Sequence, residues 1–366
     1  MAQDFNHPDW HKRFRNLITD IKQQKCVLLI GPEIVTMQGV VLREALRRHL
    51  HESNADDIAH YYERDNFFLF KEKLSKEDVQ REVSDFYESH HTQTDVEETI
   101  FKKIVRLKSH LVLSINPDHF LSNVAYKYGI EHRFAYFQHG GGAVAEVEEP
   151  TSEKPLFYNL CGAIERDNSL VLDYDDLFSL LSSLLGTPGL PLKLKTTLQQ
   201  AKHFLFIGFD FDKWYSQLLL RVLSGEKAIQ KFAIDPNTRE ENTHTFLVKQ
   251  FGIEFIEDEK AFFEELYKRC EAEGLLREII DEQTPIVVQI TQHIQKGELD
   301  KALAVAIEKG SGEGKNEFIQ LSAQYKDLML RHQKGGMDSR DYTTTFNKIT
   351  DALLQTIKRY FDHAAN

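Results

Sequence analysis

The stretch "KCVLLIGPEIV", residues 25–35, shows the alternation on which the fold of this chain depends. Its apolar run ends in Gly31, and Pro32 and Glu33 then follow as residues typical of a turn. Short apolar runs bounded by turn residues recur six more times, at 110–116, 133–137, 156–162, 203–209, 231–235 and 253–257. Runs of this length that are apolar almost throughout are typical of parallel strands covered on both faces.

Stretches with a helical spacing of apolar residues lie between most of these runs, for example at 40–52, 175–185 and 212–225. Strands that alternate with helices predict a doubly wound, parallel sheet of the Rossmann-like α/β class. Residues 53–105 are charged and separate the first two strands by too many residues for a simple crossover, so we expect an inserted helical subdomain there. The whole α/β domain is predicted to cover residues 1–280.

The end of the chain has a different pattern. After a helix expected at 260–280, the segment "DEQTP" (281–285) is predicted to be a linker, and residues 286–366 to form a small all-α domain. The candidate helices of this domain are 286–296, 298–309, 314–333 and 338–361. Leu299, Leu303 and Ile307 fall on one helix face and are expected to belong to its core.

The net charge of −12 is distributed unevenly. Residues 285–366 carry 11 Lys and Arg against 10 Asp and Glu, so the excess negative charge lies in the first 284 residues. An acidic domain lacks the basic footprint that a nucleic-acid backbone requires, so we expect no nucleic-acid partner. The sequence has no apolar run of the length of a membrane span and no signal peptide, so we expect a cytoplasmic protein that does not bind a membrane.

Polar residues and glycines follow several predicted strands at their carboxyl ends, where parallel sheets bind ligands. Gly31, for example, would let backbone N–H groups approach a phosphate, although Glu33 places a negative charge beside it. Each pattern is also common in ordinary capped turns, and that interpretation stays open. The candidate nucleotide-binding residues are Gly31, Glu33, Asn116, Asp118, Gly162, Gly208, Asp210, Asp235 and Asn237.

Taken in order, these segments resemble the SIR2-like family, in the branch found in bacterial defence effectors. The corresponding segments are "GPEIV" for a "GAGxS" turn, "INPD" for a "TNYD"-like strand end, "LCGAI" for an "HG" pair, "LVLDYDDL" for a "TYEDY"-like helix start and "FIGFDFDKW" for an "FIGYSxxD"-like segment. The resemblance covers about residues 10–275 and implies NAD as the cofactor. Deacylating members usually carry a four-cysteine zinc module. The separated Cys26, Cys161 and Cys270 cannot build one, so we expect no metal and favour the NAD-consuming branch over protein deacylation.

The resemblance also implies that a catalytic residue has been replaced. In the family a histidine occupies the position of Cys161, next to the glycine that matches Gly162, and acts as the base on the nicotinamide ribose. An imidazole, with a pKa of about 6.5, suits that role, whereas an unperturbed thiol, with a pKa of about 8.5, is mostly protonated at neutral pH. Glu33 and Val35 also replace the second glycine and the serine of the family turn. These changes at one site predict a degenerate pocket with weak or absent NAD hydrolysis.

An active enzyme remains the alternative. It would be an NAD glycohydrolase that drains NAD on infection, in which Asn116 positions the attacking water and a substitute base replaces the missing histidine. His139, which three glycines follow, and His119 are the candidates for such a base, and an exposed loop histidine is the competing interpretation of each. The catalytic candidates are therefore Asn116, Cys161 and His139.

The tail resembles the effector-associated domains of bacterial conflict systems, in particular effector-associated domain 11. The segments that carry this resemblance are "GELDKAL", "LSAQYKDL", "KGGMDSRDY" and "NKITDALL". In that family the domain recruits a partner by like-with-like association and performs no chemistry. The resemblance thus implies an immunity protein whose SIR2-like domain is tethered to a partner with a related adaptor, and a homo-oligomer is a further expectation. Tyr325, Met329 and Tyr342 are expected to form the exposed contact of the tail.

Overall fold

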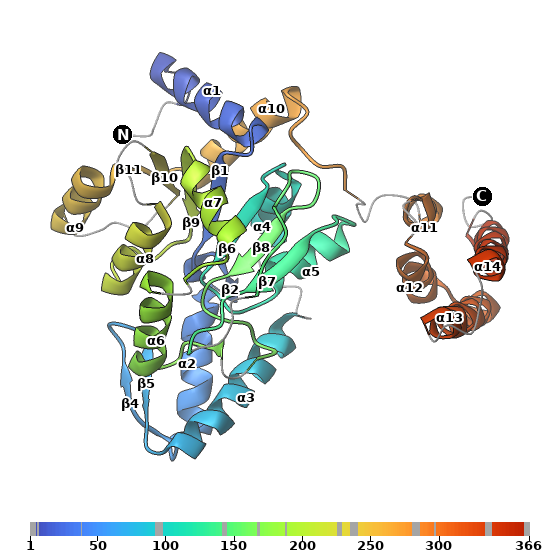
Figure 1. The fold of residues 1–366 in the computed structure, drawn as a ribbon, viewed down its shortest axis with the longest axis horizontal. Helices are drawn as coiled ribbons and strands as arrows, with labels where there is room; N and C mark the ends of the chain where they lie inside the picture. Colours follow the sequence, from blue (N-terminus) through green and yellow to red (C-terminus); the bar gives the residue numbers. More distant parts are fainter. Residues whose placement is uncertain are drawn as a thin grey trace. The chain divides into compact units, whose positions relative to one another are not determined.

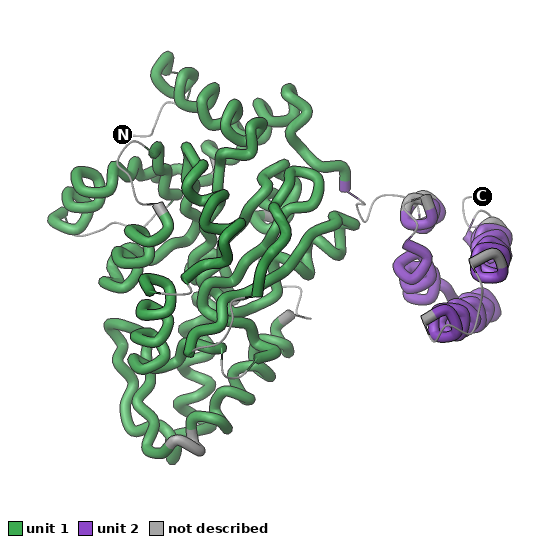
Figure 2. Tube along the Cα trace, viewed as in Figure 1, with its two compact units in different colours: residues 1–278 green, residues 279–366 purple. Residues whose placement is uncertain are grey.

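The chain forms two compact units, residues 1–278 (unit 1) and residues 279–366 (unit 2), each with its own hydrophobic core (Figure 2). The computed structural model describes residues 5, 7–37, 39–91, 98–140, 145–166, 169–186, 189–224, 229–234, 241–279, 286–295, 298–333 and 339–361. The expected linker, residues 281–285, lies outside these described residues.

Unit 1 is built on a seven-stranded sheet in which all neighbouring strands are parallel, in the order β11-β10-β9-β1-β6-β8-β7 (Figure 1). The strands are β1 (Cys26–Ile30), β6 (Leu111–Ser114), β7 (Arg133–Tyr136), β8 (Leu156–Asn159), β9 (His203–Ile207), β10 (Gln230–Ile234) and β11 (Ile253–Ile256). Each lies within an apolar run from which a strand was expected, except that β10 begins one residue before its run, and the Rossmann-like α/β class is confirmed. β1 is central, because Val27 pairs with both Leu111 of β6 and Phe204 of β9.

Helices cover both faces of this sheet, as the two sides of β1 show. Val27 belongs to a core that helices within residues 174–224 complete. The pKa of the thiol of Cys26, the neighbouring residue of β1, is raised by burial and by the nearby Asp20 and Cys270, which come from other helices. The helices of unit 1 are α1 (Pro8–Lys22), α2 (Leu42–Ser53), α3 (Lys73–His91), α4 (Glu98–Arg106), α5 (Phe120–Lys127), α6 (Tyr174–Leu185), α7 (Leu192–Gln200), α8 (Trp214–Ser224), α9 (Glu241–Phe246) and α10 (Glu259–Ala272).

The insertion between β1 and β6 is not purely helical, so this part of the prediction was wrong. It contains α3 and α4, but also an antiparallel hairpin of β4 (Ile58–Tyr62) and β5 (Phe67–Phe70). Aromatic residues favour strands, and Tyr61 and Phe68 pair across the hairpin with ring centroids 5.0 Å apart. Asn66, in the turn, has a φ of 61°, a conformation that asparagine tolerates better than most residues. A short antiparallel pair, β2 (Thr36–Met37) and β3 (Val40–Val41), precedes α2.

Helix α10 ends at Ala272, earlier than the expected end near residue 280, because Gly274 adopts a positive φ of 65° just beyond its C-cap. The chain then runs back to the end of α4, where Leu276 pairs with Leu107. Arg277 is buried there, and its guanidinium donates hydrogen bonds to main-chain carbonyls of residues 105, 107, 109 and 152. The segment after α10 is therefore held against the rest of unit 1 by the hydrogen bonds of Arg277 and the pairing of Leu276.

Unit 2 consists of α11 (Ile286–Gln295), α12 (Leu299–Lys309), α13 (Gly312–Gln333) and α14 (Ser339–Tyr360), one for each candidate helix. Leu299 and Leu303 are buried in its core, and Ile307 packs against them. Tyr325 and Tyr342 also pack against this core. The Tyr342 hydroxyl donates to Met329 Sδ at 3.4 Å. These three residues are therefore half-buried, with part of each side chain packed inside the unit.

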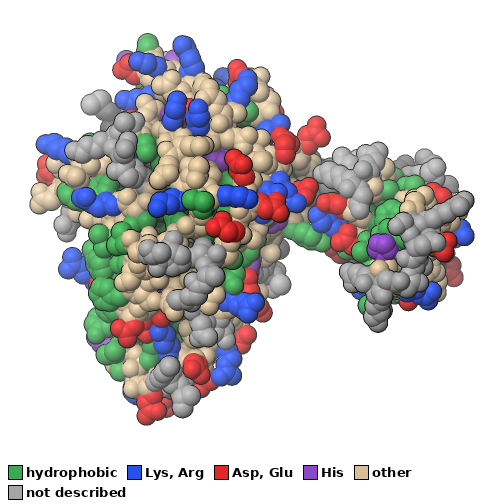
Figure 3. Space-filling view, in the orientation of Figure 1, with side chains coloured by type: hydrophobic (Ala, Val, Ile, Leu, Met, Phe, Trp, Pro, Cys, Tyr) green, Lys and Arg blue, Asp and Glu red, His purple; other side chains and the backbone are tan. Residues whose placement is uncertain are grey.

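Two surface properties are relevant to partners. No helix among the described residues is long and apolar enough to cross a membrane. Figure 3 shows hydrophobic side chains gathered on the side of unit 1 formed by α6 and α8. Phe178 of α6 and Trp214 of α8 are exposed there, with ring centroids 6.4 Å apart. Contiguous apolar surface of this kind is uncommon away from contact regions.

Candidate functional site

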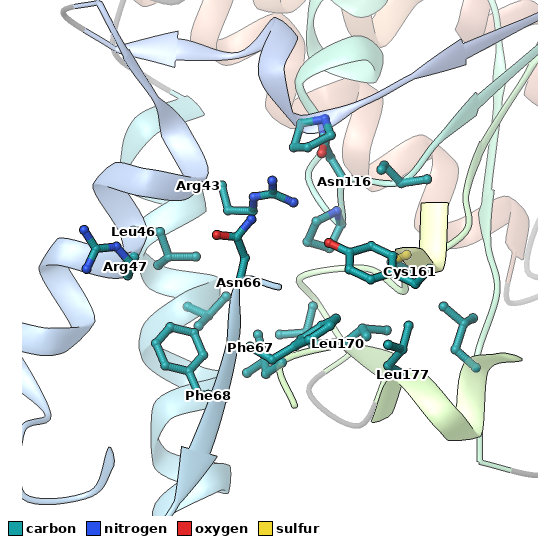
Figure 4. Close-up of a pocket in the computed structure, with 18 of the residues that line it drawn as sticks. Arg43, Leu46, Arg47, Asn66, Phe67, Phe68, Asn116, Cys161, Leu170 and Leu177 are labelled. Atoms are coloured by element: carbon teal, nitrogen blue, oxygen red, sulfur yellow. The ribbon is translucent and has the colours of Figure 1, made fainter. Parts of the chain in front are cut away.

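The carboxyl ends of the central strands open into a pocket (Figure 4). Pro32 follows β1, Asn116 follows β6 and Cys161 follows β8, and all three line it. The remaining lining residues come mainly from α2, the hairpin β4–β5, α3, α6, α8 and the segment 170–172. The structure thus brings together two of the three catalytic candidates, Asn116 and Cys161, at the sheet edge where the sequence placed them.

The surroundings of Cys161 do not favour a role as a general base. Burial raises the pKa of its thiol to about 12, and the positive charge of Arg43 opposes this rise only in part. A thiol with such a pKa is protonated at neutral pH, so it neither accepts a proton nor offers a thiolate nucleophile. Cys161 therefore contributes shape and apolar surface to the pocket.

Asn116 is buried and held by the main chain around it. Its Nδ2 donates to the carbonyl oxygen of Gly31 at 3.2 Å, and its backbone N–H donates to Ser114 Oγ at 3.0 Å. These contacts fix the amide between the end of β6 and the turn after β1. A positioned amide of this kind can orient a ligand or a water molecule, but it has no proton to exchange near neutral pH.

The turn after β1 is closed by the turn after β9. The N–H of Gly31 donates to the carbonyl oxygen of Ile207 at 2.9 Å, and that of Glu33 donates to the carbonyl oxygen of Gly208 at 3.1 Å. A Cβ on Gly31 would overlap the carbonyl oxygen of Gly208, and one on Gly208 would lie 2.5 Å from Ile34 N. The two glycines allow these turns to interlock, so two N–H groups of the expected phosphate cradle are engaged by the chain itself.

Gly162 and Asp118 are also surrounded by their own chain. Gly162 has a φ of 88°, and a Cβ there would overlap the carbonyl oxygen of Ser169. Asp118 is buried, accepts a hydrogen bond from the N–H of Phe120 at 3.0 Å and does not line the pocket. Burial raises the pKa of its carboxyl group to about 6.

Asp210 does not line the pocket, but it pairs with Arg43, which does. Its Oδ2 is 3.5 Å from Nη2 of Arg43 and 3.8 Å from Nζ of Lys213, and its Oδ1 accepts from the N–H of Asp212 at 3.1 Å. Asp235 and Asn237, the remaining candidates, lie outside the described residues.

Neither candidate histidine lines the pocket. His139 is buried, and its Nε2 donates to the carbonyl oxygen of Leu170 at 3.1 Å, whereas the Leu170 side chain faces the pocket. His139 therefore lies behind the pocket wall. His119 lies at the start of α5, where its Nε2 is 2.6 Å from Glu165 Oε2 and its ring packs on Phe134.

Sequence reasoning missed Arg43, one of two arginines that line this pocket. It lies in the first turn of α2, next to the buried residues Leu42, Leu46 and Leu50. Burial raises the pKa values of the Tyr61 and Tyr215 hydroxyls and of the Cys161 thiol. The positive charge of Arg43 partly opposes each of these rises. The only signal in the sequence is an arginine that borders an apolar helix stripe, a pattern also typical of a solvated helix face.

The pocket is small compared with most cofactor sites. Its volume is about 100 Å³, whereas sites for drug-sized ligands and cofactors usually measure roughly 300–1,000 Å³. The turn after β1, which was expected to receive a phosphate, is packed against the turn after β9. The described residues contain no cluster of three or more His, Cys, Asp or Glu side chains that could hold a metal ion.

Comparisons with known families identify two domains in this chain. The family model for a SIR2-like domain matches residues 110–256, which extend from β6 to β11. The family model for effector-associated domain 11 matches residues 285–361, which contain α11 to α14. No curated protein matches the chain. Both resemblances inferred from the sequence are confirmed, while β1, its glycine turn and Arg43 precede the matched SIR2-like segment.

Proposed function

We propose that this chain, which joins a SIR2-like domain to an effector-associated domain 11, is a bacterial conflict-system protein whose SIR2-like domain does not turn over NAD. The observation that carries the proposal is the chemistry of the pocket around Asn116. Its described lining contains no histidine, aspartate or glutamate. General base catalysis needs a group whose pKa lies near the working pH, and burial raises the pKa values of Cys161 and Tyr61 to about 12.

We expect the purified full-length protein to release nicotinamide from NAD with a turnover number far below roughly 1 per second, the lower end of the range for typical enzymes. The reason is the lack of a base beside Asn116. Incubation with NAD followed by chromatographic separation of nicotinamide measures the rate, and Asn116→Ala serves as the control for contaminating activity. Turnover of about 1 per second or faster that disappears in Asn116→Ala would contradict the proposal.

A second variant separates the two causes of low activity. Cys161→His with Glu33→Gly restores the residues that the family resemblance implies at these positions. A gain of NAD hydrolysis in this variant would identify the replaced side chains as the cause. No gain in a folded variant would identify the narrow pocket and the interlocked turns as the cause.

The alternative is an active NAD glycohydrolase that depletes NAD on infection. The observation in its favour is Asn116, a buried amide held at the carboxyl end of a central strand, as a water-positioning residue would be. This function requires a base from outside the described lining. His139 could supply it only by giving up its hydrogen bond to Leu170 and crossing the pocket wall.

For unit 2 we propose that it tethers the chain to a partner with a similar helical domain. Among the described residues of unit 2, the exposed large apolar side chains are Ile319, 47% exposed, and Leu330, 51% exposed. Both lie on α13, where a spacing of eleven residues places them about 20° apart around the helix axis. We call the side of α13 marked by these two residues the exposed stripe. The near-neutral charge of the tail adds little long-range attraction to it.

We expect Ile319→Asp and Leu330→Asp each to weaken partner binding by about thirtyfold or more, the loss typical of a central contact residue. Gln324→Asp is the matched control, because Gln324 is exposed on α13 but lies far around the helix from this stripe. A pull-down from the native host with the full chain as bait measures the effect. Binding that a few hundred millimolar salt abolishes, or recovery of nucleic acid alone, would contradict a contact of this apolar kind.

A further inference from the structure

We propose that the pocket beside Asn116 binds a small amphipathic carboxylate, either aromatic or branched aliphatic, whose carboxylate group lies on Arg43. This inference rests on the proposed function only in taking this pocket as the ligand site of the SIR2-like domain. It names the class of ligand that the pocket accepts in place of a dinucleotide.

Arg43 has hydrogen-bond donors to spare. Nη2 of Arg43 is 3.5 Å from Asp210 Oδ2, and Asn66 lies on the same side. When the Asn66 amide is oriented so that both of its atoms are hydrogen-bonded, its oxygen accepts from the same Nη2 at 2.9 Å. A guanidinium has five N–H donors. Arg43 also forms a side-chain hydrogen bond with Tyr215. Asp210, Asn66 and Tyr215 are thus three partners for five donors, and a planar carboxylate matches the fork of a guanidinium.

The pair of Arg43 with Asp210 is loose. Its separation of 3.5 Å exceeds the roughly 2.7–2.9 Å of a charge-assisted hydrogen bond. Asp210 also lies near the ammonium group of Lys213, and its second oxygen is used by the N–H of Asp212. The negative charge of Asp210 is thus shared between two cations, so it neither saturates Arg43 nor excludes a second carboxylate from the opposite side.

The other arginine of the pocket rim is already occupied. Arg47 forms an ion pair with Glu44, and its guanidinium lies over the ring of Tyr61 at 5.0 Å. Figure 4 shows it turned away from the cavity, whereas Arg43 points into it on the side of Asn116. Arg43 is therefore the group on which an anion in the cavity would bind.

Most of the other side chains that line the cavity are apolar. Figure 4 shows Phe67, Leu170 and Leu177 together at the end away from Arg43 and Asn116. The lining also includes other aliphatic side chains, namely Leu172, Leu180 and Leu219. A volume of about 100 Å³ leaves room for one ring or a short branched chain. Burying such a group against these walls is favourable, whereas inorganic phosphate would leave them without contacts. Arg43 at one end of the cavity and the apolar side chains at the other therefore favour a ligand that carries a negative charge on a small apolar group.

The direct test compares benzoate with benzamide on the full-length protein by isothermal titration calorimetry. The two molecules have nearly the same shape and differ in charge. We expect benzoate to bind with a dissociation constant of about 1 mM or tighter, and benzamide to bind at least about tenfold more weakly, because only the carboxylate forms charge-assisted hydrogen bonds. No binding of benzoate, or equal binding of the two, would overturn the inference. This comparison needs no variant and does not depend on how a substitution affects folding.

Variants then locate the anion. Arg43→Met should weaken benzoate binding about ten- to hundredfold, the range expected for lost hydrogen bonds to a charged group. Arg48→Met is the control, since Arg48 lies in the same helix, is exposed and does not line the pocket. An equal loss in both variants would place the carboxylate elsewhere and overturn the inference. Rapid release of nicotinamide from NAD would contradict the proposed function alone and would leave the comparison of benzoate with benzamide unaffected.

Discussion

Gly208→Ala is expected to lower the free energy of unfolding of unit 1 by about 3–5 kcal/mol. The added methyl group would lie 2.5 Å from Ile34 N and 3.0 Å from Ile34 Cβ. Relief of that overlap requires the turn after β1 to separate from the turn after β9. In addition, Gly208 has a φ of 60°, which costs an alanine about 1–2 kcal/mol. Urea denaturation followed by tryptophan fluorescence measures the change, because both tryptophans of the chain, Trp10 and Trp214, belong to unit 1.

Gly39→Ala is the matched control. Gly39 has a similar positive φ of 78°, but no atom of the described residues lies within 4 Å of a Cβ built there. This variant should therefore show the conformational cost alone, about 1–2 kcal/mol. Equal effects of the two substitutions would show that the turns do not interlock as described. The structural role that we assign to Gly208 would then be wrong.

Arg277→Met is expected to cost about 3–5 kcal/mol of unfolding free energy. The guanidinium donates to the carbonyl oxygens of Val105 at 2.7 Å, Ser109 at 2.6 Å and Ser152 at 2.8 Å, and also to that of Leu107. Methionine keeps the apolar stem but leaves these carbonyls without their donors. Burial lowers the pKa of Arg277 to about 10, so removal of a buried cation offsets part of the loss.

Two further variants test this interpretation. Arg277→Lys retains a charge but has fewer donors and no planar fork, so we expect an intermediate loss of stability. Arg81→Met removes an exposed arginine that pairs with Asp78 on the surface of α3, and it should cost less than about 1 kcal/mol. If urea denaturation gives the same small loss of unfolding free energy for Arg277→Met as for Arg81→Met, the hydrogen bonds of the buried Arg277 contribute little to stability.

The sheet and the helices of unit 2 could be predicted because their signals are local. Strands covered on both faces need continuous apolar runs, and those runs mark β1, β6, β7, β8, β9, β10 and β11. The proximity of Asn116 and Cys161 also followed, since the carboxyl ends of parallel strands meet at one edge. The hairpin β4–β5 was missed because its charged and aromatic residues were interpreted as a helix.

The details of the site could not be predicted because they depend on contacts between distant segments. Gly31 serves either to admit a phosphate or to admit another turn, and both uses require only the absence of a Cβ. Its contact with Gly208 decides between them and is visible only in three dimensions. Arg43 likewise has the sequence context of a solvated residue until the hairpin and the turn after β9 enclose it.

The central position of β1 also has a consequence during protein synthesis. One neighbour of β1, β9, begins about 180 residues later in the chain, so a ribosome that adds 5–20 residues per second completes this pair roughly 10–35 s after β1 emerges. Until then one edge of an entirely apolar strand has no neighbour, which makes the nascent chain prone to aggregation. Unit 2, whose helices contact mainly their neighbours in sequence, has no such delay. The slow step in producing this protein is therefore expected to be the closure of β9 on β1, and chaperones that shield nascent apolar strands should increase its yield.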